Sequence, residues 1–312
     1  MQINKNTSEI NFDKNTIITI GTFDGVHLGH QRIINELIEE AKDKLYRSVL
    51  ITFEPHPREV VGRGPTKLLT TLEERLELLS KFNLDFVLVI NFTYEFSRLH
   101  YDEFYTKYIH DKIGLQEVIV GYDHMFGRDR EATLEQLKEL GEKFKFKVRR
   151  IKPVTIDGQV VSSSLIREII FRGDVCLAEK YLGRFYLLKG IVVGGDGRGK
   201  ILGFPTANIE PLSDKKLIPA EGVYFVSVKI NNDNYYGMLN IGVRPTFATE
   251  QKKVIEVNIF NFDGDIYGKK VDLYFHRRLR SEIKFDSKED LIKQLEKDRT
   301  QCEKYIKEIK NN

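Results

Sequence analysis

The chain has few cysteines and lacks any long hydrophobic run. Cys176 and Cys302 are its only two cysteines in 312 residues, and neither belongs to a Cys-x-x-Cys pair or a histidine-rich cluster. This usage predicts a reducing compartment and no zinc site. Because no apolar run approaches the roughly 20 residues of a membrane span, and the polar N-terminus lacks the apolar core of a signal peptide, we expect a cytoplasmic protein without a membrane partner.

The chain also lacks a strong excess of charge of either sign. Its net charge of +3 at pH 7 is small for this length, so bulk charge indicates no nucleic-acid partner, although a local basic face stays open. With 41% hydrophobic and 30% charged residues, the composition is that of an ordinary globular protein. The length favours two domains, and no internal repeat is present. The sequence does not indicate an oligomeric state.

The hydrophobic pattern changes near residue 183. Before it, continuous apolar runs (17–20, 49–53, 86–90, 118–120 and 148–151) alternate with helical patterns such as 72–82, 104–113 and 134–144. This alternation predicts a doubly wound parallel sheet with helices on both faces. After it, short strand-like runs (187–193, 223–230, 236–241, 254–260 and 271–275) predict an antiparallel barrel or sandwich. Ser287 and Asp290 have the spacing of a capping box before a terminal helix. We expect domains at 1–182 and 183–312.

A glycine- and histidine-rich segment joins the first apolar run to an amphipathic helical pattern. It extends from Gly21 to His30 and also contains His27. A helix N-terminus favours an anion, since its backbone amides are free and its partial charge is positive. Gly25 and Gly29 would let the backbone approach a ligand, and the two imidazoles could donate hydrogen bonds to phosphate oxygens. They would then stabilise a phosphoryl group in transfer. The same spacing fits a tight turn with two solvated histidines equally well.

A second junction between a strand-like run and a helical pattern reads Val-Ser-Ser-Ser-Leu-Ile-Arg from Val161 to Arg167. Its hydroxyls can cap a helix, and Arg167 could hold a phosphate in a bidentate contact. N-capping alone also explains the serines, and Arg167 would then be an ordinary surface residue. Two such junctions in one domain favour a phosphate site.

Three features of the second domain suit phosphate chemistry. The glycine-rich residues 194–201 nearly match a P-loop, but Ile201 stands where Ser or Thr should bind magnesium, so they form either a flap over phosphates or a solvated hairpin loop. Pro205-Thr-Ala-Asn208 offers a hydroxyl and an amide for magnesium and phosphate, or is simply a turn. Glu256 could be a general base, or part of the exposed polar face of a half-buried strand.

The motifs together resemble a known family. The His-x-Gly-His pattern and the later Ser-Ser-Ser-Leu-Ile-Arg resemble the HxGH nucleotidyltransferases. With Phe-Glu-Pro-His-Pro at 53–57 and Gly-Tyr-Asp-His-Met-Phe-Gly at 121–127, the first half resembles the FAD synthetase module of bacterial bifunctional riboflavin kinase/FAD synthetases. Segments 197–208, 222–224, 240–247 and 265–268 resemble, in order, a riboflavin kinase domain. The resemblance spans essentially the whole chain and implies a Rossmann-like nucleotidyltransferase domain followed by a six-stranded barrel with a terminal helix.

The resemblance also implies an activity and a set of site residues. It implies ATP-dependent phosphorylation of riboflavin to FMN in the C-terminal domain, then adenylylation of FMN to FAD with release of pyrophosphate in the N-terminal domain, with Mg²⁺ as cofactor. In the N-terminal domain it assigns the ATP phosphates to Gly21, Phe23, Asp24, Gly25, His27, Gly29, His30, Ser163, Ser164 and Arg167, and the flavin to Asp123 and Phe126. In the C-terminal domain it assigns ATP to Gly197, Gly199, Lys200, Thr206 and Asn208, Mg²⁺ to Thr206 and Asn208, proton removal to Glu256, and the flavin to Arg280 and Glu282.

Some positions leave alternatives open. Asp24 is expected on the phosphate or metal side, while His56 could equally be a rigid loop residue between two prolines. Surface ion pairing accounts equally well for Arg280 and Glu282. Thr22, Ala132 and Asn258 replace residues common in the family (Asn, Gly and His), and none of these changes removes a residue with an assigned role.

Two other hypotheses follow from the same residues. The N-terminal domain could adenylylate another phosphorylated substrate or have lost transfer, with the kinase kept. Alternatively, the chain could be a flavin- or nucleotide-binding regulator, which predicts binding without product. The presence of His27, His30, Thr206, Asn208 and Glu256 argues against a regulator.

Overall fold

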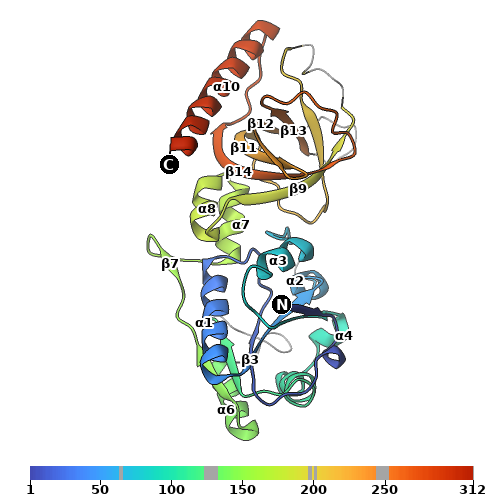
Figure 1. Cartoon of the computed structure of the whole chain (residues 1–312), viewed down its shortest axis with the longest axis vertical. Coiled ribbons are helices and arrows are strands. Elements are labelled where there is room, and N and C mark those ends of the chain that lie inside the picture. Colours follow the sequence, from blue (N-terminus) through green and yellow to red (C-terminus); the bar gives the residue numbers. More distant parts are fainter. Residues whose placement is uncertain (63–65, 123–132, 196–198, 200–201, 244–252, 312) are drawn as a thin grey trace. The chain divides into compact units, whose positions relative to one another are not determined.

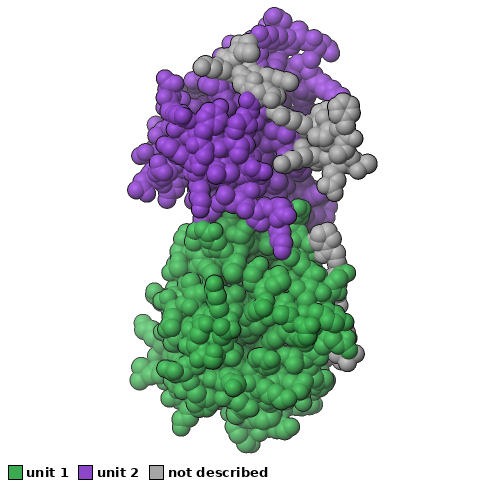
Figure 2. All heavy atoms as spheres, turned by 90° about the vertical axis from the view of Figure 1, so that its right-hand side faces the viewer, with its two compact units in different colours: residues 1–163 green, residues 164–312 purple. Residues whose placement is uncertain are grey.

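The computed structural model describes residues 1–62, 66–122, 133–195, 199, 202–243 and 253–311 (Figure 1). The chain divides into two compact units, Met1–Ser163 and Ser164–Asn312, which Figure 2 colours separately. Among the helices of these described residues, none has the length and apolar character needed to cross a membrane.

Unit 1 is built on a six-stranded parallel sheet. Its strands are β1 (Gln2–Asn4), β2 (Thr16–Ile20), β3 (Arg47–Glu54), β4 (Phe86–Asn91), β5 (Glu117–Val120) and β6 (Lys147–Arg150). Their order is β1-β4-β3-β2-β5-β6, and each neighbouring pair is parallel. All five residues of β2 are buried, as expected for a central strand covered on both faces. The predicted parallel sheet is thus confirmed.

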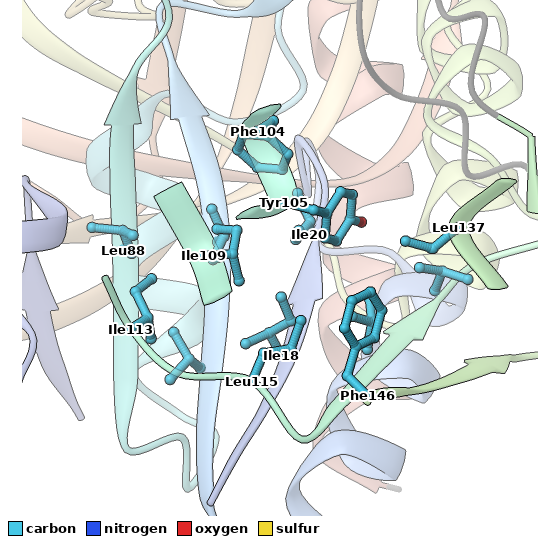
Figure 3. Close-up of a cluster of buried hydrophobic side chains, with 14 of the residues drawn as sticks. Ile18, Ile20, Leu88, Phe104, Tyr105, Ile109, Ile113, Leu115, Leu137 and Phe146 are labelled. Carbon is cyan, nitrogen blue, oxygen red and sulfur yellow. The ribbon is translucent and has the colours of Figure 1, made fainter. Parts of the chain in front are cut away.

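The helical segments described in this unit are η1 (Thr7–Glu9), α1 (Leu28–Lys44), α2 (Pro57–Val60), α3 (Leu72–Leu79), α4 (Tyr94–Ser97), α5 (Tyr101–Glu103), η2 (Phe104–His110) and α6 (Leu134–Phe144), followed by the hairpin β7 (Thr155–Ile156) and β8 (Gln159–Val160). They include α1 and α3, which pack on one face of this sheet, and η2 and α6, which pack on the other. Ile18 and Ile17 belong to different core clusters because successive strand residues face opposite ways. Figure 3 shows the Ile18 cluster, where η2 and α6 supply Ile109 and Leu137. The sequence predicts helix at 104–113, and the structure forms a π-helical segment there.

Unit 2 is a closed antiparallel barrel. After α7 (Ser163–Phe171) and α8 (Val175–Leu182), its strands are β9 (Tyr186–Val193), β10 (Ala207–Pro211), β11 (Gly222–Ile230), β12 (Asp233–Val243), β13 (Lys253–Ile259) and β14 (Lys270–Arg280), and α10 (Lys288–Asn311) follows. The barrel order is β10-β13-β12-β11-β14-β9, so the six-stranded barrel is confirmed. Strand β10 does not appear in the hydrophobic pattern, because its sequence is Ala-Asn-Ile-Glu-Pro.

The boundary between the two units lies earlier in the sequence than the predicted domain boundary. The sequence predicts a boundary after residue 182, which would put α8 in the first domain. Instead α8 packs against β9 and β14, and its Cys176 Sγ donates a hydrogen bond of 3.2 Å to the His276 carbonyl oxygen. Val175, Ala178 and Leu182 are buried on α8, so this helix belongs with the barrel by contact. The functional boundary at residue 182 stays a prediction.

Candidate functional site

The fold places the glycine- and histidine-rich segment where parallel sheets bind ligands. Strand β2 pairs with β3 on one side and β5 on the other. The chain runs from β2 through α1 to β3, and only later returns to β5, so the carboxyl end of β2 is a topological switch point. Ligands of open α/β sheets bind in the crevice at such a point. Residues 21–27 connect the end of β2 to the start of α1 there.

The two histidines form a stacked pair at the N-terminus of α1. His27 caps this helix, and its Nδ1 accepts a hydrogen bond of 3.3 Å from the His30 backbone N–H. The rings are 3.6 Å apart with 17° between their planes, and the edge of Phe23 lies against His30. Because Nδ1 is the acceptor, neutral His27 carries its proton on Nε2, where it can be donated to an anion.

The backbone around the histidines is tightly wound. Phe23, Gly25 and Val26 all have positive φ, at 49°, 84° and 37°. Only glycine adopts such values freely, so the conformations of Phe23 and Val26 are strained and need support from the surroundings. A Cβ on Gly29 would lie 3.1 Å from two atoms of the His27 ring, so a side chain there would crowd the imidazole.

Asp24 holds this loop in place. Its buried carboxylate accepts hydrogen bonds from the backbone N–H of Leu69 (3.1 Å) and Thr70 (2.8 Å), and from the Thr70 hydroxyl (3.0 Å). These hydrogen bonds anchor the loop, and the predicted contact of Asp24 with phosphate or metal stays a prediction. Ser163 Oγ donates to the Asp24 carbonyl oxygen at 2.8 Å, which brings the two predicted junctions together.

The other predicted residues of the first site are placed less fully. On α7, Ser164 is exposed and Arg167 is half-buried. His56 is buried and caps α2, accepting from the Arg58 N–H at 3.2 Å. The predicted flavin residues, Asp123 and Phe126, lie outside the described residues, as does Ala132.

The second site is a row of polar residues across three barrel strands. Glu256 on β13 lies directly opposite Asn208 on β10 and Asn240 on β12. Side chains opposite each other in antiparallel strands have Cβ atoms about 4.5–5.5 Å apart. Asn240 Nδ2 donates to Glu282 Oε1 at 3.2 Å, so a second carboxylate joins the row. Asn240 is missing from the sequence-based site, because only the strand register reveals its place.

Two described residues before β10, Gly199 and Pro205, lie close to residues of the second site or its strands. Asn258 Nδ2 donates a hydrogen bond of 2.6 Å to the Pro205 carbonyl oxygen, which ties the strand of Glu256 to the segment of Thr206. A Cβ on Gly199 would lie 3.0 Å from Thr206 Oγ1, so Gly199 itself lies close to this hydroxyl. Gly197 and Lys200 lie outside the described residues.

Arg280 forms an ion pair with a buried carboxylate. Its Nε and terminal nitrogen lie 2.9 Å and 2.8 Å from Asp298 Oδ2 on α10. The Asp298 side chain is only 3% exposed, so surface ion pairing does not describe this contact. The pair fastens α10 to the end of β14, beside the segment that carries Glu282.

One histidine of the barrel has a strongly perturbed pKa. Burial, reinforced by the nearby charge of Arg277, lowers the pKa of His276 to about 4. Its Nε2 lies 3.0 Å from Ser227 Oγ, and its ring contacts Phe185 and Phe225. His276 is therefore neutral near pH 7, and the sequence pattern gives no signal for it.

The donor atoms of the barrel site suit magnesium better than a softer metal. Within the described residues, no group of three or more His, Cys, Asp or Glu side chains is placed to hold a metal ion. Thr206 and Asn208 instead offer a hydroxyl and an amide oxygen, and Asn208 lies opposite Glu256 in the strand register. Mg²⁺ prefers oxygen ligands and usually keeps several waters and substrate phosphates, so this set fits it.

Comparisons with known proteins cover both halves of the chain. The FAD synthetase family model matches residues 9–165, and the riboflavin kinase family model matches residues 182–306. The bifunctional riboflavin kinase/FMN adenylyltransferase of Bacillus subtilis is 35% identical over 301 residues, which are 95% of this chain and 94% of that protein. The chain belongs to this family. Its member from Listeria monocytogenes is 37% identical over 288 residues, covering 92% of this chain and 91% of that protein.

A solved structure shares the whole fold of this family member. The crystal structure of a macrolide-efflux protein from Streptococcus pneumoniae has a TM-score of 0.86 and 32% sequence identity, covering 96% of this chain and 97% of that chain. Family membership and the two-part fold predicted from the sequence are therefore confirmed. Efflux is named for that protein alone.

Proposed function

We propose that this chain phosphorylates riboflavin to FMN at the barrel row and adenylylates FMN to FAD at the histidine pair, consuming ATP in both steps. The observation that carries the proposal is the register of Asn208, Glu256 and Asn240, which places a carboxylate beside the Thr206 segment in a chain that also holds the His27–His30 pair. We assign the transferase to residues 1–182 and the kinase to 183–312. The family matches at 9–165 and 182–306 support this division.

In the kinase reaction, Glu256 accepts the proton of the terminal ribityl hydroxyl of riboflavin. The resulting oxygen attacks the γ-phosphorus of ATP, and the bond to the β-phosphate oxygen breaks to leave FMN and ADP. The Thr206 hydroxyl and the Asn208 amide oxygen would hold Mg²⁺, which offsets charge on the ATP phosphates. Asn258 fixes this segment through the Pro205 carbonyl oxygen.

In the transferase reaction, the FMN phosphate attacks the α-phosphorus of ATP and pyrophosphate leaves. A phosphate monoester is already ionised at pH 7, so this step needs charge stabilisation more than a general base. His27 Nε2–H, His30 and the backbone amides at the start of α1 would donate to the phosphate oxygens. The stacked arrangement of the rings holds both imidazoles at one helix end.

We also propose that the protein works in the cytoplasm. Cys176 and Cys302 are both free thiols, which is compatible with a reducing compartment. Riboflavin, FMN and ATP are the partners that these two sites require.

Two variants test the assignment of the sites. Glu256→Gln should reduce FMN formation by a factor on the order of 10²–10⁴, as expected for loss of a general base, and leave FAD formation from added FMN unchanged. His30→Ala should do the reverse. Loss of both activities in either variant, with unchanged thermal unfolding, would refute the two-site assignment.

The choice of acceptor is tested separately. We expect ATP-dependent pyrophosphate release with FMN, and much less with other phosphorylated acceptors. Release with another acceptor and not with FMN would favour a transferase of different specificity. Binding of flavin and ATP without either product would favour a regulator.

A further inference from the structure

A buried arginine lies beside the carboxyl ends of two central strands. Arg75, on α3, has a side chain that is only 3% exposed. Its guanidinium donates to the Thr22 carbonyl oxygen, to Thr52 Oγ1 at 3.0 Å, to the Phe53 carbonyl oxygen at 3.3 Å and to Glu54 Oε2 at 2.9 Å. Arginine is almost never this buried unless its charge is paired, so the position is specified by these contacts.

The acceptors of Arg75 belong to two segments of the ligand side of the sheet. Thr22 lies in the loop that leads from β2 to the histidine pair, while Thr52, Phe53 and Glu54 end β3. Thr52 Oγ1 also donates to the Thr22 carbonyl oxygen at 3.0 Å, so the strand and the loop are tied directly as well. A planar guanidinium with five donors can serve both segments at once, whereas a lysine ammonium cannot match this geometry.

The segment that leads into α3 holds the same loop at a second point. The Asp24 carboxylate accepts from the backbone of Leu69 and Thr70, and Thr70 Oγ1 in turn accepts from the Gly25 N–H at 2.9 Å. Residues 69–75 therefore form hydrogen bonds with the loop on both sides of residue 23. Asp24 and Glu54 also supply the negative charge that favours the buried guanidinium.

Phe23 lies between these two anchors. Its φ of 49° is unfavourable for a bulky residue, and its ring lies edge-on to His30 with the ring centres 5.1 Å apart. Holding Thr22 and Asp24 fixes the backbone of Phe23, and the Phe23 ring in turn fixes one side of the His30 imidazole. The contacts thus run from Arg75 to a proposed phosphate-binding group without Arg75 touching substrate.

We propose that Arg75 is a positioning residue for adenylyl transfer, which sets the orientation of His30 through the loop backbone and Phe23. This inference rests on the proposed transferase function. It gives α3 a part in the chemistry that neither the sequence motifs nor the family descriptions assign. A misplacement of about 1 Å in a catalytic group can cost about 10²-fold in rate, so a small shift of this loop is enough to matter.

Arg75→Lys tests the proposal, with the kinase of the same chain as an internal control. We expect kcat for FAD formation from FMN to fall at least about tenfold, with KM for ATP and FMN changed less than about threefold and riboflavin kinase activity unchanged. The matched control is Arg47→Lys. Arg47 donates to Thr16 Oγ1 at 2.7 Å and the Ile113 carbonyl oxygen at 2.5 Å at the opposite end of the same sheet. The Arg47→Lys variant should lower thermal stability without lowering kcat for FAD formation.

A double-mutant cycle separates positioning from general support of the fold. Phe23→Leu keeps an apolar side chain and removes the ring that contacts His30. If Arg75 acts through Phe23, the losses in kcat from Phe23→Leu and Arg75→Lys will be less than additive in free energy. Additive losses, or a loss in Arg75→Lys no larger than that in Arg47→Lys, would overturn the proposal.

A milder variant keeps the test decisive if Arg75→Lys does not fold. Thr52→Val preserves shape but removes both the acceptor for Arg75 and the donor to Thr22. We expect a several-fold fall in kcat for FAD formation with the kinase unchanged, and full transferase activity would overturn the proposal. If the unchanged chain forms no FAD from FMN, the proposed function itself fails, which is a distinguishable result.

Discussion

The close packing of Gly195 against Asn208 allows the kinase site to be perturbed with little change to the fold. A Cβ on Gly195 would lie 1.8 Å from Asn208 Nδ2 and 2.6 Å from its Cγ, whereas ordinary contacts begin at 3.4 Å. In Gly195→Ala the amide must therefore move by about 1.6 Å. The Asn208 side chain can rotate away, so we expect a small cost in stability. A displacement of this size predicts a fall of about 10²-fold in kcat for FMN formation.

The adjacent glycine provides the control. A Cβ on Gly194 would meet no atom within 4 Å, so Gly194→Ala makes the same chemical change without displacing Asn208. Initial rates of FMN formation from riboflavin, and of FAD formation from FMN, should be measured for both variants. Full kinase activity in Gly195→Ala, or an equal loss in Gly194→Ala, would refute the reasoning.

Three further predictions follow from other contacts. Asn258→Asp replaces the donor to the Pro205 carbonyl oxygen with a repelling oxygen, so we expect KM for ATP to rise and kinase stability to fall by about 1–3 kcal/mol, measured by kinetics and thermal unfolding. Because burial lowers the pKa of His276 to about 4 in the folded chain, the unfolded chain binds the proton first as the pH falls. The contribution of His276 to the free energy of unfolding is therefore full above pH 6.5 and is lost as the pH falls toward 4. Its share of the loss between pH 7 and pH 5 is about 2 kcal/mol, so His276→Asn should flatten that dependence in thermal unfolding. Gly114→Ala and Gly158→Ala both strain a positive φ, but only Gly114→Ala also places a Cβ 2.2 Å from a backbone oxygen. Gly114→Ala should therefore destabilise the fold far more, and equal unfolding midpoints for the two variants would contradict this.

Local sequence patterns predicted most of the fold. The apolar runs and their alternation with helical patterns were sufficient for the parallel sheet, and α6 spans the predicted residues 134–144. The barrel was less visible, since β10 has few apolar residues and becomes a strand through pairing with β9 and β13. The sequence of α8 is equally compatible with packing on the sheet or on the barrel, so sequence patterns do not predict which unit contains this helix.

The candidate sites were predictable as motifs but not as arrangements. The position of His27 and His30 at a helix N-terminus follows from a strand, glycines and an amphipathic pattern along one stretch of chain. The partners of Asp24 lie about 45 residues away, and no periodicity indicates them. Asn240 and Arg75 enter the account only through strand register and buried hydrogen bonds, which depend on the tertiary structure.

The central claim is that one chain makes FMN and then FAD at two sites. It is tested most directly by incubating the purified chain with riboflavin, ATP and Mg²⁺ and resolving the flavins by chromatography over time. We predict that FMN appears first and that FAD follows without any added enzyme. The absence of any flavin nucleotide, or FMN that never proceeds to FAD, would contradict the account.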